Sequence, residues 1–393
     1  MLNDGTVELG IIKRLIENAQ EERHTNSEVA MQSARDAMLR ARLGKYREQE
    51  LESTNLVGFL LNGIGKHGDA INTIEECVLR YNIYQLTGNE IIHFTDLASE
   101  LAFGYFRIAQ YNEALKTLQH VLDVVNMYKL SEQYKVPCLM RMGVANTYID
   151  NYDLAREYFT EALKVCEQNQ WIEQINTIYV NLGENYFRTG NYPEAINLYT
   201  QAAEYFKSTD NPKLCVALSS LAAIKLELLQ YKEAEELCLL AEQTANKYSD
   251  IHCLMRVYKN LAELYLGTKR FEESIVTAKK ALTLANETNN KFEQVLIQRT
   301  LGRACFEMKD FQHAHHHFSA ALELAERIQS KNQSAILYSD LALCYANLNK
   351  MPKAKLHAQI ALDEAKSINA PQLIDYAVHT LDLLNSLNYP SAN

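Results

Sequence analysis

The densest group of ionisable side chains in the sequence is a run of histidines at positions 313, 315, 316 and 317. On a helix, His313, His316 and His317 share one face at spacings of three and four residues, where two imidazoles can bind zinc or nickel. No cysteine or carboxylate at a matching spacing completes a four-ligand site. We therefore interpret the run as a solvated helix face, keep these three histidines as a weak metal candidate, and predict no metal site.

A second motif, Gly63-Ile-Gly-Lys-His-Gly68, matches the GxGxxG pattern of phosphate-binding loops. That chemistry requires a strand before the glycines and a helix after them. Here a helical pattern precedes the glycines, so the motif predicts a turn between two helices. The sequence contains no nucleophile elbow, HExxH motif or P-loop either, and we predict a protein that is not an enzyme and needs no cofactor.

Charge and composition exclude further classes of function. The chain has 393 residues and a net charge of −10, which disfavours a general nucleic-acid or anionic-membrane surface. No apolar run is long enough for a membrane span, and the acidic N-terminus is not a secretory signal. The eight cysteines form no CxxC motif and fall on apolar helix positions, which is typical of reduced thiols in a cytoplasmic protein.

The elements that position these side chains follow from a long sequence repeat. Small residues recur at spacings of 40, 44, 41, 40, 39, 40, 40 and 40, from Ala30 to Ala354, and an aromatic residue precedes most of them by three positions. Further small residues lie twelve positions before and seven positions after these anchors. Each period therefore predicts two amphipathic helices, A and B, whose backbones approach closely at the small residues.

The sequence predicts nineteen helices, with ends uncertain by a few residues. They are expected at 7–22, 26–43, 46–64, 67–85, 90–108, 111–127, 131–149, 152–168, 171–189, 192–208, 212–228, 231–247, 251–267, 271–287, 291–308, 311–328, 331–348, 351–367 and 371–387.

The residues from Tyr179 to Ala202, YVNLGENYFRTGNYPEAINLYTQA, resemble a tetratricopeptide repeat. The resemblance covers most of the chain, but the period is longer than is usual in that family. Long repeats of this kind resemble those of bacterial signalling proteins and of Rap-type peptide receptors. The resemblance implies an all-α, right-handed solenoid of about nine helix pairs plus a capping helix. We expect a single solenoid over 1–393, with a divergent cap pair at 1–45, eight repeats at 46–367 and the capping helix at 371–387.

In that family the A helices line a concave groove, and certain A-helix positions contact the ligand. Carried over to this sequence, those positions predict partner-binding residues at Asn55, Phe59, Phe103, Arg107, Arg141, Asn181, Arg188, Arg256, Lys259, Asn260, Arg299 and Arg303. Asparagine can bond the backbone of an extended peptide, and arginine can bind carboxylates with two nitrogens. This set predicts a basic groove for an acidic partner. The five-residue clamp by which some family members hold chaperone tails is not matched at Glu263, Thr300, Ile336 or Asp340.

The sequence therefore predicts a non-enzymatic scaffold that binds a protein or peptide segment in its groove, and it allows a homodimer through the solenoid ends. Two alternatives stay open. One is a peptide-gated signalling regulator that resembles the Rap-type receptors, and the other is the sensory half of a larger histidine kinase or diguanylate cyclase.

Overall fold

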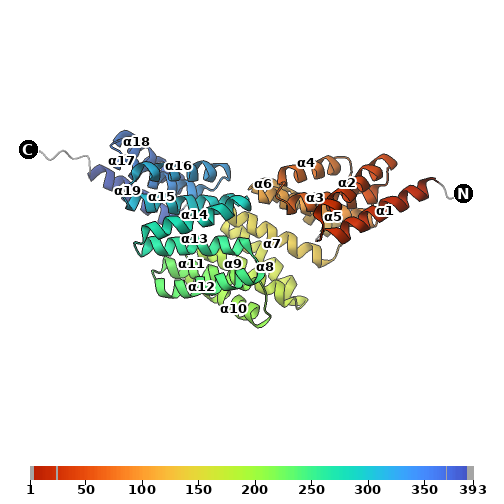
Figure 1. Cartoon of the computed structure of the whole chain (residues 1–393), viewed down its shortest axis with the longest axis horizontal. Coiled ribbons are helices and arrows are strands. Elements are labelled where there is room, and N and C mark those ends of the chain that lie inside the picture. Colours follow the sequence, from red (N-terminus) through yellow and green to blue (C-terminus); the bar gives the residue numbers. More distant parts are fainter. Residues whose placement is uncertain (1–3, 24, 369, 387–393) are drawn as a thin grey trace, which may run out of the picture. The chain divides into compact units, whose positions relative to one another are not determined.

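The computed structural model describes residues 4–23, 25–368 and 370–386, which form α-helices, one short 3₁₀ helix and no strand (Figure 1). The predicted all-α class is confirmed for this part of the chain. Residues 1–3, 24, 369 and 387–393 belong to the predicted domain but lie outside the described residues.

The helices divide between two compact units, and the boundary along the chain falls within α7. Unit 1 ends at Ala145 and unit 2 begins at Asn146. Unit 1 contains α1 (Asp4–Glu22), α2 (Ser27–Gly44), α3 (Arg47–Gly63), α4 (His67–Val78), η1 (Ile83–Gln85), α5 (Asn89–Arg107), α6 (Tyr111–Met127) and most of α7 (Glu132–Tyr148). Unit 2 continues with α8 (Tyr152–Gln168), α9 (Ile172–Arg188), α10 (Tyr192–Ser208), α11 (Leu214–Glu227), α12 (Tyr231–Tyr248), α13 (Ile251–Gly267), α14 (Phe271–Glu287), α15 (Lys291–Glu307), α16 (Phe311–Arg327), α17 (Lys331–Asn347), α18 (Met351–Ser367) and α19 (Pro371–Ser386). The single solenoid over the whole chain stays a prediction.

The repeat locates the helices closely. Helices α6, α8, α10, α13, α14 and α18 begin and end at the predicted residues. All other ends except one differ from the prediction by three residues or fewer. Over the described ranges, the fold is confirmed as nine helix pairs followed by a closing helix.

The exception is α4, for which the repeat predicts 67–85 and which ends at Val78. After it the chain forms the short helix η1, where the Asn82 side chain accepts a hydrogen bond from the amide of Tyr84. Gly88 then takes a positive φ before α5. The longer repeat spacing at this point reflects these inserted residues, because the extra length lies in the connection and not in a helix.

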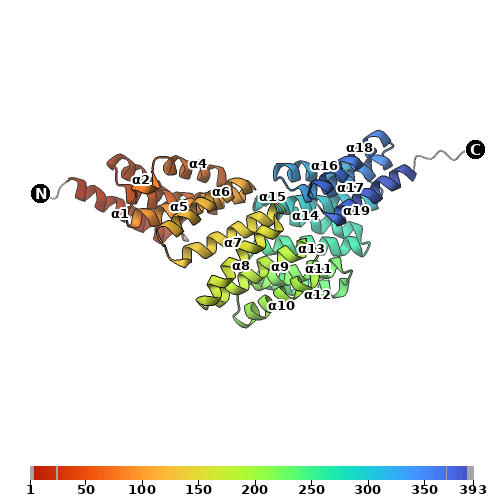
Figure 2. The ribbon, with the colours of Figure 1, turned by 180° about the vertical axis from the view of Figure 1, so that it is seen from behind.

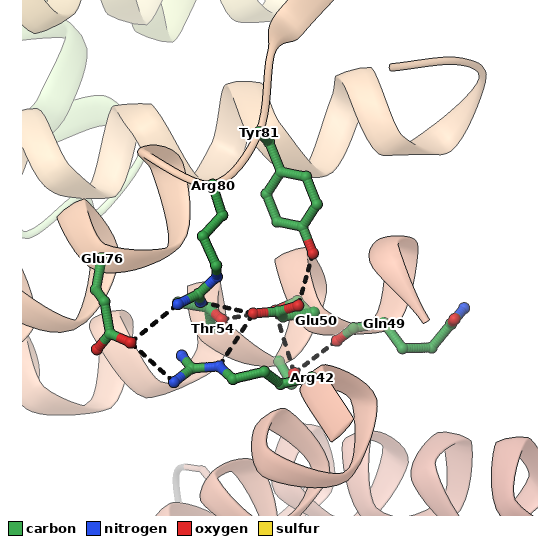
Figure 3. Close-up of polar contacts among 8 residues, drawn as sticks. Arg42, Gln49, Glu50, Thr54, Glu76, Arg80 and Tyr81 are labelled. Atoms are coloured by element: carbon green, nitrogen blue, oxygen red, sulfur yellow. Dashed lines mark hydrogen bonds and ion pairs between the residues drawn. The ribbon is translucent and has the colours of Figure 1, made fainter. Parts of the chain in front are cut away.

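The end of α4 is fixed by a buried carboxylate on α3. Glu50 is 3 % exposed, and it binds Arg42 from α2 together with Arg80 and Tyr81 from the segment after α4 (Figure 3). Residues from α3, α4, η1 and α5 form one apolar core beside it. The polar cluster thus holds the irregular segment of unit 1 against its regular helices.

Unit 2 consists of two layers of helices, seen from opposite sides in Figures 1 and 2. Each helix packs on the next in sequence, and the odd-numbered helices from α9 to α19 also contact one another in succession. The contacts described for the even-numbered helices are all with odd-numbered ones. The odd-numbered helices are therefore the more closely spaced layer, as the inner layer of a curved stack must be. We call their side facing away from the even-numbered helices the inner face of unit 2.

The predicted small-residue columns are the points of closest approach between the two layers. Ala195, Ala234 and Ala314 are fully buried, and the buried hydroxyl of Ser274 donates to the carbonyl of Ala262 in the preceding helix. At Gly302 an added Cβ would lie 2.5 Å from the Phe318 ring. Such contacts leave no room for a larger side chain.

This contact predicts opposite effects for two glycine substitutions. Gly302→Ala should destabilise the protein by about 1–3 kcal/mol, because overpacking outweighs the better helix propensity of alanine. Gly68→Ala, in α4 with no atom within 4 Å of the new Cβ, should stabilise it by roughly 0.5–1 kcal/mol. Urea denaturation followed by circular dichroism measures both. Equal effects of the two substitutions would contradict close packing at Gly302.

The turns of unit 2 share one backbone geometry. Every turn from α7–α8 to α17–α18 contains one residue with a left-handed backbone, and only the one at Gly190 is a glycine. At α9–α10, for example, the amide of Asn191 donates to the carbonyl of Tyr186 and the amide of Gly190 to that of Phe187. This is the Schellman pattern of helix ends. Its repetition keeps the helix pairs alike even though the turn residues vary.

The eight cysteines are all buried and unbridged. Burial raises the pKa of the Cys138 thiol, and likewise that of Cys238, to about 12. These two thiols are therefore protonated near neutral pH and are poor nucleophiles. None of the helices in the described ranges combines the length and the apolar character needed to cross a bilayer.

Candidate functional site

The inner face of unit 2 carries a continuous line of polar contacts between successive odd-numbered helices. Glu184 of α9 lies 3.8 Å from Arg256 of α13, and Arg256 donates to Ser220 of α11 at 2.8 Å. Further along, the Arg303 side chain of α15 donates to Glu263 of α13 at 2.8 Å. Because these side chains come from neighbouring helices of one layer, they form a single surface and not isolated pairs.

Glu184 is the most strongly paired carboxylate of this surface. It accepts a hydrogen bond from the Nε of Arg188 at 2.8 Å and one from the hydroxyl of Tyr199 at 3.2 Å. Burial alone would raise the pKa of Glu184, but Arg188 and Arg256 outweigh it and hold that pKa at about 2. The carboxylate is therefore charged at any physiological pH.

Arg188 also joins parts of unit 2 that are far apart in sequence. Its guanidinium lies 5.2 Å from the ring centroid of Tyr148 in α7 and 4.3 Å from that of Phe292 in α15. The two rings meet edge to face with centroids 5.0 Å apart. Several helix pairs separate Tyr148 from Phe292 along the chain. The stack of helices in unit 2 therefore turns far enough to place the end of α7 against α15.

A second contact closes the same gap. The carboxylate of Asp150, in the α7–α8 turn, accepts a hydrogen bond from the backbone amide of Asn332 at 3.2 Å. The Asn332 side chain donates to the hydroxyl of Tyr152 at 3.0 Å, and this hydroxyl donates to Asp150 at 2.8 Å. Ser330, the N-cap residue of α17, makes no side-chain cap bond. Asp150 therefore caps α17 from the far end of the unit. We call these contacts and the Arg188 stack the seam.

The C-terminal part of the inner face repeats the same chemistry. Asp340 of α17 is 6 % exposed, and it accepts hydrogen bonds from the Nε of Arg299 at 2.6 Å and from the Tyr376 hydroxyl at 2.7 Å. Lys259 forms an ion pair with Glu293 at 3.0 Å. The surface is thus lined by cations that neighbouring acids hold in place.

Five of the predicted groove residues are cations of unit 2, and each lies beside an acid. Arg188 and Arg256 share Glu184, Lys259 pairs with Glu293, Arg299 with Asp340, and Arg303 with Glu263. The inner face is therefore close to electrically balanced, not strongly basic. Sequence spacing identified the cations but missed Glu293 and Asp340 as their partners.

The two predicted asparagines of unit 2 differ. Asn260 is buried and donates to the carbonyl of Ser219 at 2.7 Å, so its amide joins α13 to α11. Asn181 is half-buried on α9, one turn before Glu184, and the described part of the chain shows no hydrogen bond to its amide. Asn181 is thus the better placed of the two to meet a ligand.

The predicted groove residues of unit 1 form a separate group on α3, α5 and α7. The guanidinium groups of Arg107 and Arg141 each lie 5.9 Å from the Phe103 ring. Arg141 is exposed, and it donates to the carbonyl of Ser99 at 3.3 Å. Phe59 is 41 % exposed beneath Arg23, and Asn55 is half-buried one turn earlier on α3. These residues make an aromatic and cationic surface within unit 1.

The histidine run and the glycine motif take no part in these surfaces. His313 bonds Asp310 beside it, and His317 bonds Gln298. Among the residues that the structure describes, no three histidine, cysteine or acidic side chains gather closely enough to hold a metal ion. The glycine motif forms the turn between α3 and α4, with Gly65 in a left-handed conformation, as its position after a helix predicts.

Comparison with known proteins agrees with this geometry. The family model described as tetratricopeptide repeat matches residues 174–247 and 250–327. The matched residues lie within unit 2, and there the match agrees with the tetratricopeptide repeats that the sequence predicts.

The chain is also similar to individual known proteins. It is 25 % identical over 183 residues to the response regulator aspartate phosphatase J of Bacillus subtilis, covering 44 % of this chain. It spans about half the length of that relative. A Rap protein solved with competence and sporulation factor has a TM-score of 0.64 at 14 % identity, over 93 % of this chain and 99 % of the other. The Rap conjugation regulator of plasmid pLS20, solved with the Phr* peptide, has a TM-score of 0.60 at 16 % identity, over 81 % and 96 %. At such identities the two structures establish the fold alone.

Proposed function

We propose that the inner face of unit 2 binds a short peptide or protein segment, and that the chain acts as a non-enzymatic adaptor. The observation that carries this proposal is the continuous polar surface from α9 to α19, whose charged side chains are partly exposed and already held in position. A solenoid that is ordered before its partner arrives loses little conformational freedom on binding. The solved Rap proteins of the same fold were bound to a factor and to a peptide, which supports this choice.

The chemistry of the surface fits an extended main chain. The Asn181 amide can donate to a peptide carbonyl and accept from a peptide amide. The cations beside it favour a segment with some acidic side chains. Each cation already has an acid partner, however. An acidic side chain of the ligand would therefore share a cation with that partner and would not neutralise an unpaired charge. We propose an acidic or mixed-charge segment as the partner, and a cytoplasmic location, which the unbridged cysteines support.

We propose that the chain has no enzymatic activity, on the basis of its own side chains. The relative from Bacillus subtilis is named a phosphatase. In the described residues of this chain, the charged groups of the inner face are engaged with one another, and none forms a nucleophile with an adjacent base. The adaptor is preferred to a peptide-gated regulator or the sensory half of a kinase or cyclase, since no separate observation favours either.

A pair of asparagine substitutions tests peptide binding. A random-peptide library is passed over the full chain, and the affinity of an enriched peptide is measured by fluorescence anisotropy. Asn181→Ala should weaken binding roughly 10-fold, the equivalent of about 1.4 kcal/mol, with little change in thermal stability. Asn197→Ala, on the exposed face of α10, is the matched control and should leave the affinity unchanged. A library that yields no binder, or equal affinities for both variants, would contradict the proposed site.

A further inference from the structure

Two of the eight cysteines contact each other inside unit 2. Cys215 lies in the first turn of α11 and Cys253 in the first turn of α13, and their thiols form a hydrogen bond. Both side chains belong to one apolar core, and both are at most 1 % exposed. Because α11 and α13 pack on each other in the inner layer, the fold itself brings the two sulfur atoms together.

The carboxylate of Asp250 contacts both cysteines. Asp250 is the N-cap residue of α13, and its Oδ1 accepts a hydrogen bond from the backbone amide of Cys253 at 3.0 Å. Its Oδ2 accepts one from the thiol of Cys215, with a distance of 3.6 Å between Sγ and Oδ2. Asp250 is half-buried, so the two thiols lie directly beneath a partly exposed side chain. The first turn of a helix opens locally more easily than its middle, which gives a small molecule a route to the pair.

Other buried thiols of the chain have different partners. Cys138 donates to the carbonyl of Leu118, and Cys344 donates to that of Phe311. A backbone carbonyl cannot form a covalent bond with a thiol on oxidation, whereas a second thiol can. In the ranges that the structure describes, no three histidine, cysteine or acidic side chains are arranged to hold a metal ion. The contact between Cys215 and Cys253 therefore indicates redox chemistry.

The hydrogen bonds decide which of the two thiols reacts first. The hydrogen bond to Cys253, burial and the charge of Asp250 raise the pKa of the Cys215 thiol, so Cys215 keeps its proton near neutral pH. The thiolate is the form that attacks an oxidant. Cys253 is therefore the first thiol to be oxidised, and Cys215 reacts with it afterwards.

We propose that Cys215 and Cys253 form a reversible disulfide when the protein meets hydrogen peroxide. The Cys253 sulfur attacks one peroxide oxygen and the O–O bond breaks, which gives a sulfenic acid and one water. The Cys215 sulfur then attacks the Cys253 sulfur and breaks its S–O bond. The Cys215 proton passes through the Asp250 carboxylate to the departing hydroxide, which leaves as a second water. Two thiols are oxidised to one disulfide, and one peroxide is reduced to two waters.

The disulfide links the part of the inner layer that carries the polar surface. Arg256 lies one turn after Cys253 on α13, and it donates to Ser220 of α11 at 2.8 Å. A covalent bond between the first turns of α11 and α13 fixes the spacing of the two helices that make this contact. The inference goes beyond the proposed function, because the disulfide can form whether or not the inner face binds a peptide.

The test treats the full, folded chain with hydrogen peroxide. Remaining free thiols are then alkylated, and the protein is digested with trypsin without reduction and analysed by mass spectrometry. The expected result is a linkage between the peptides 214–225 and 248–256, which contain Cys215 and Cys253. Dithiothreitol should return both cysteines to free thiols.

Two variants locate the reaction. Cys215→Ser should abolish the linkage. Cys344→Ser removes a thiol that donates to a backbone carbonyl, so it is the matched control and should leave the yield of the linkage unchanged. Circular dichroism confirms that each variant is folded before it is oxidised.

Three results would overturn the inference. The first is that both cysteines stay free after peroxide treatment of the folded wild-type chain. The second is that Cys253 pairs with Cys238, which lies in the same core on α12. The third is that the linkage between Cys215 and Cys253 appears only when the chain is oxidised in urea. None of these results bears on peptide binding, so the proposed function is judged separately.

Discussion

Glu50→Ala is expected to destabilise unit 1 by about 2–3 kcal/mol, the cost of removing a buried carboxylate from two half-buried arginines and a tyrosine. Glu50 is 3 % exposed, and its carboxylate contacts Arg42 at 3.2 Å and Arg80 at 2.6 Å. The Tyr81 hydroxyl donates to the same carboxylate at 2.6 Å (Figure 3). Alanine would leave two guanidinium groups and a phenol without the carboxylate that accepts their hydrogen bonds.

Glu76→Ala is the matched control, because Glu76 contacts the same two arginines at 3.0 and 2.9 Å while its side chain is 61 % exposed. It should cost less than about 1 kcal/mol, as exposed ion pairs do. Amide hydrogen exchange of α2, α3 and α4 measures both variants locally, and urea denaturation followed by circular dichroism measures them over the whole chain. If the two variants prove equally stable, the buried carboxylate does not fix the segment after α4.

The helices could be predicted well from the sequence because one physical cause produces both the pattern and the packing. Small residues recur where two backbones touch, so the columns through Ala195 and Ala234 locate the helices to within a few residues. The prediction is wrong at the end of α4, because the longer repeat spacing there comes from the connection and not from a longer helix. Asn82 and Gly88 were the available signals, since a side-chain cap and a glycine with a positive φ interrupt helices.

The site could be predicted less completely. Periodicity, combined with the ligand-contact positions of the family that the sequence resembles, predicts which residues lie on the inner face, and it selected Arg188, Arg256 and Arg299. It contains no information on partners from distant repeats, so it missed the contact of Arg188 with Phe292 and that of Asp150 with Asn332. These seam contacts depend on the total rotation of the stack. That rotation is the sum of the small rotations between successive repeats. Periodicity also placed Asn260 in the groove, although its amide bonds a neighbouring helix.

Glu184→Gln tests the centre of the inner face and should cost about 2–3 kcal/mol at pH 7. Glutamine keeps the shape of the side chain but leaves Arg188 and Arg256 without their shared charge. Arg188 is also the residue that lies against Tyr148 and Phe292, so the loss should loosen the seam. The matched control is Glu323→Gln, which breaks an ion pair with Arg327 at the same spacing of four residues on an exposed face. It should change stability by less than about 0.5 kcal/mol.

The stability that the Glu184 carboxylate contributes should also fall as the pH falls. The pKa of Glu184 is about 2 in the folded protein and near 4.5 in the unfolded chain. The unfolded chain therefore binds the proton first as the pH falls, so the stability that the carboxylate contributes is complete above about pH 5 and is lost between pH 4.5 and 2. A tenfold change in the proton affinity of the carboxylate corresponds to about 1.4 kcal/mol, and partial exposure of the side chain reduces the total to about 2–3 kcal/mol.

Urea denaturation followed by the fluorescence of Trp171, the one tryptophan of the chain, measures unit 2 from pH 7 down to pH 3. The curves of the wild-type protein and the glutamine variant should converge as the pH falls, because acid removes from the wild type the charge that the variant lacks throughout. A difference that stays constant over this range would mean that Glu184 stabilises unit 2 through its shape and its hydrogen bond to Tyr199, and not through its charge.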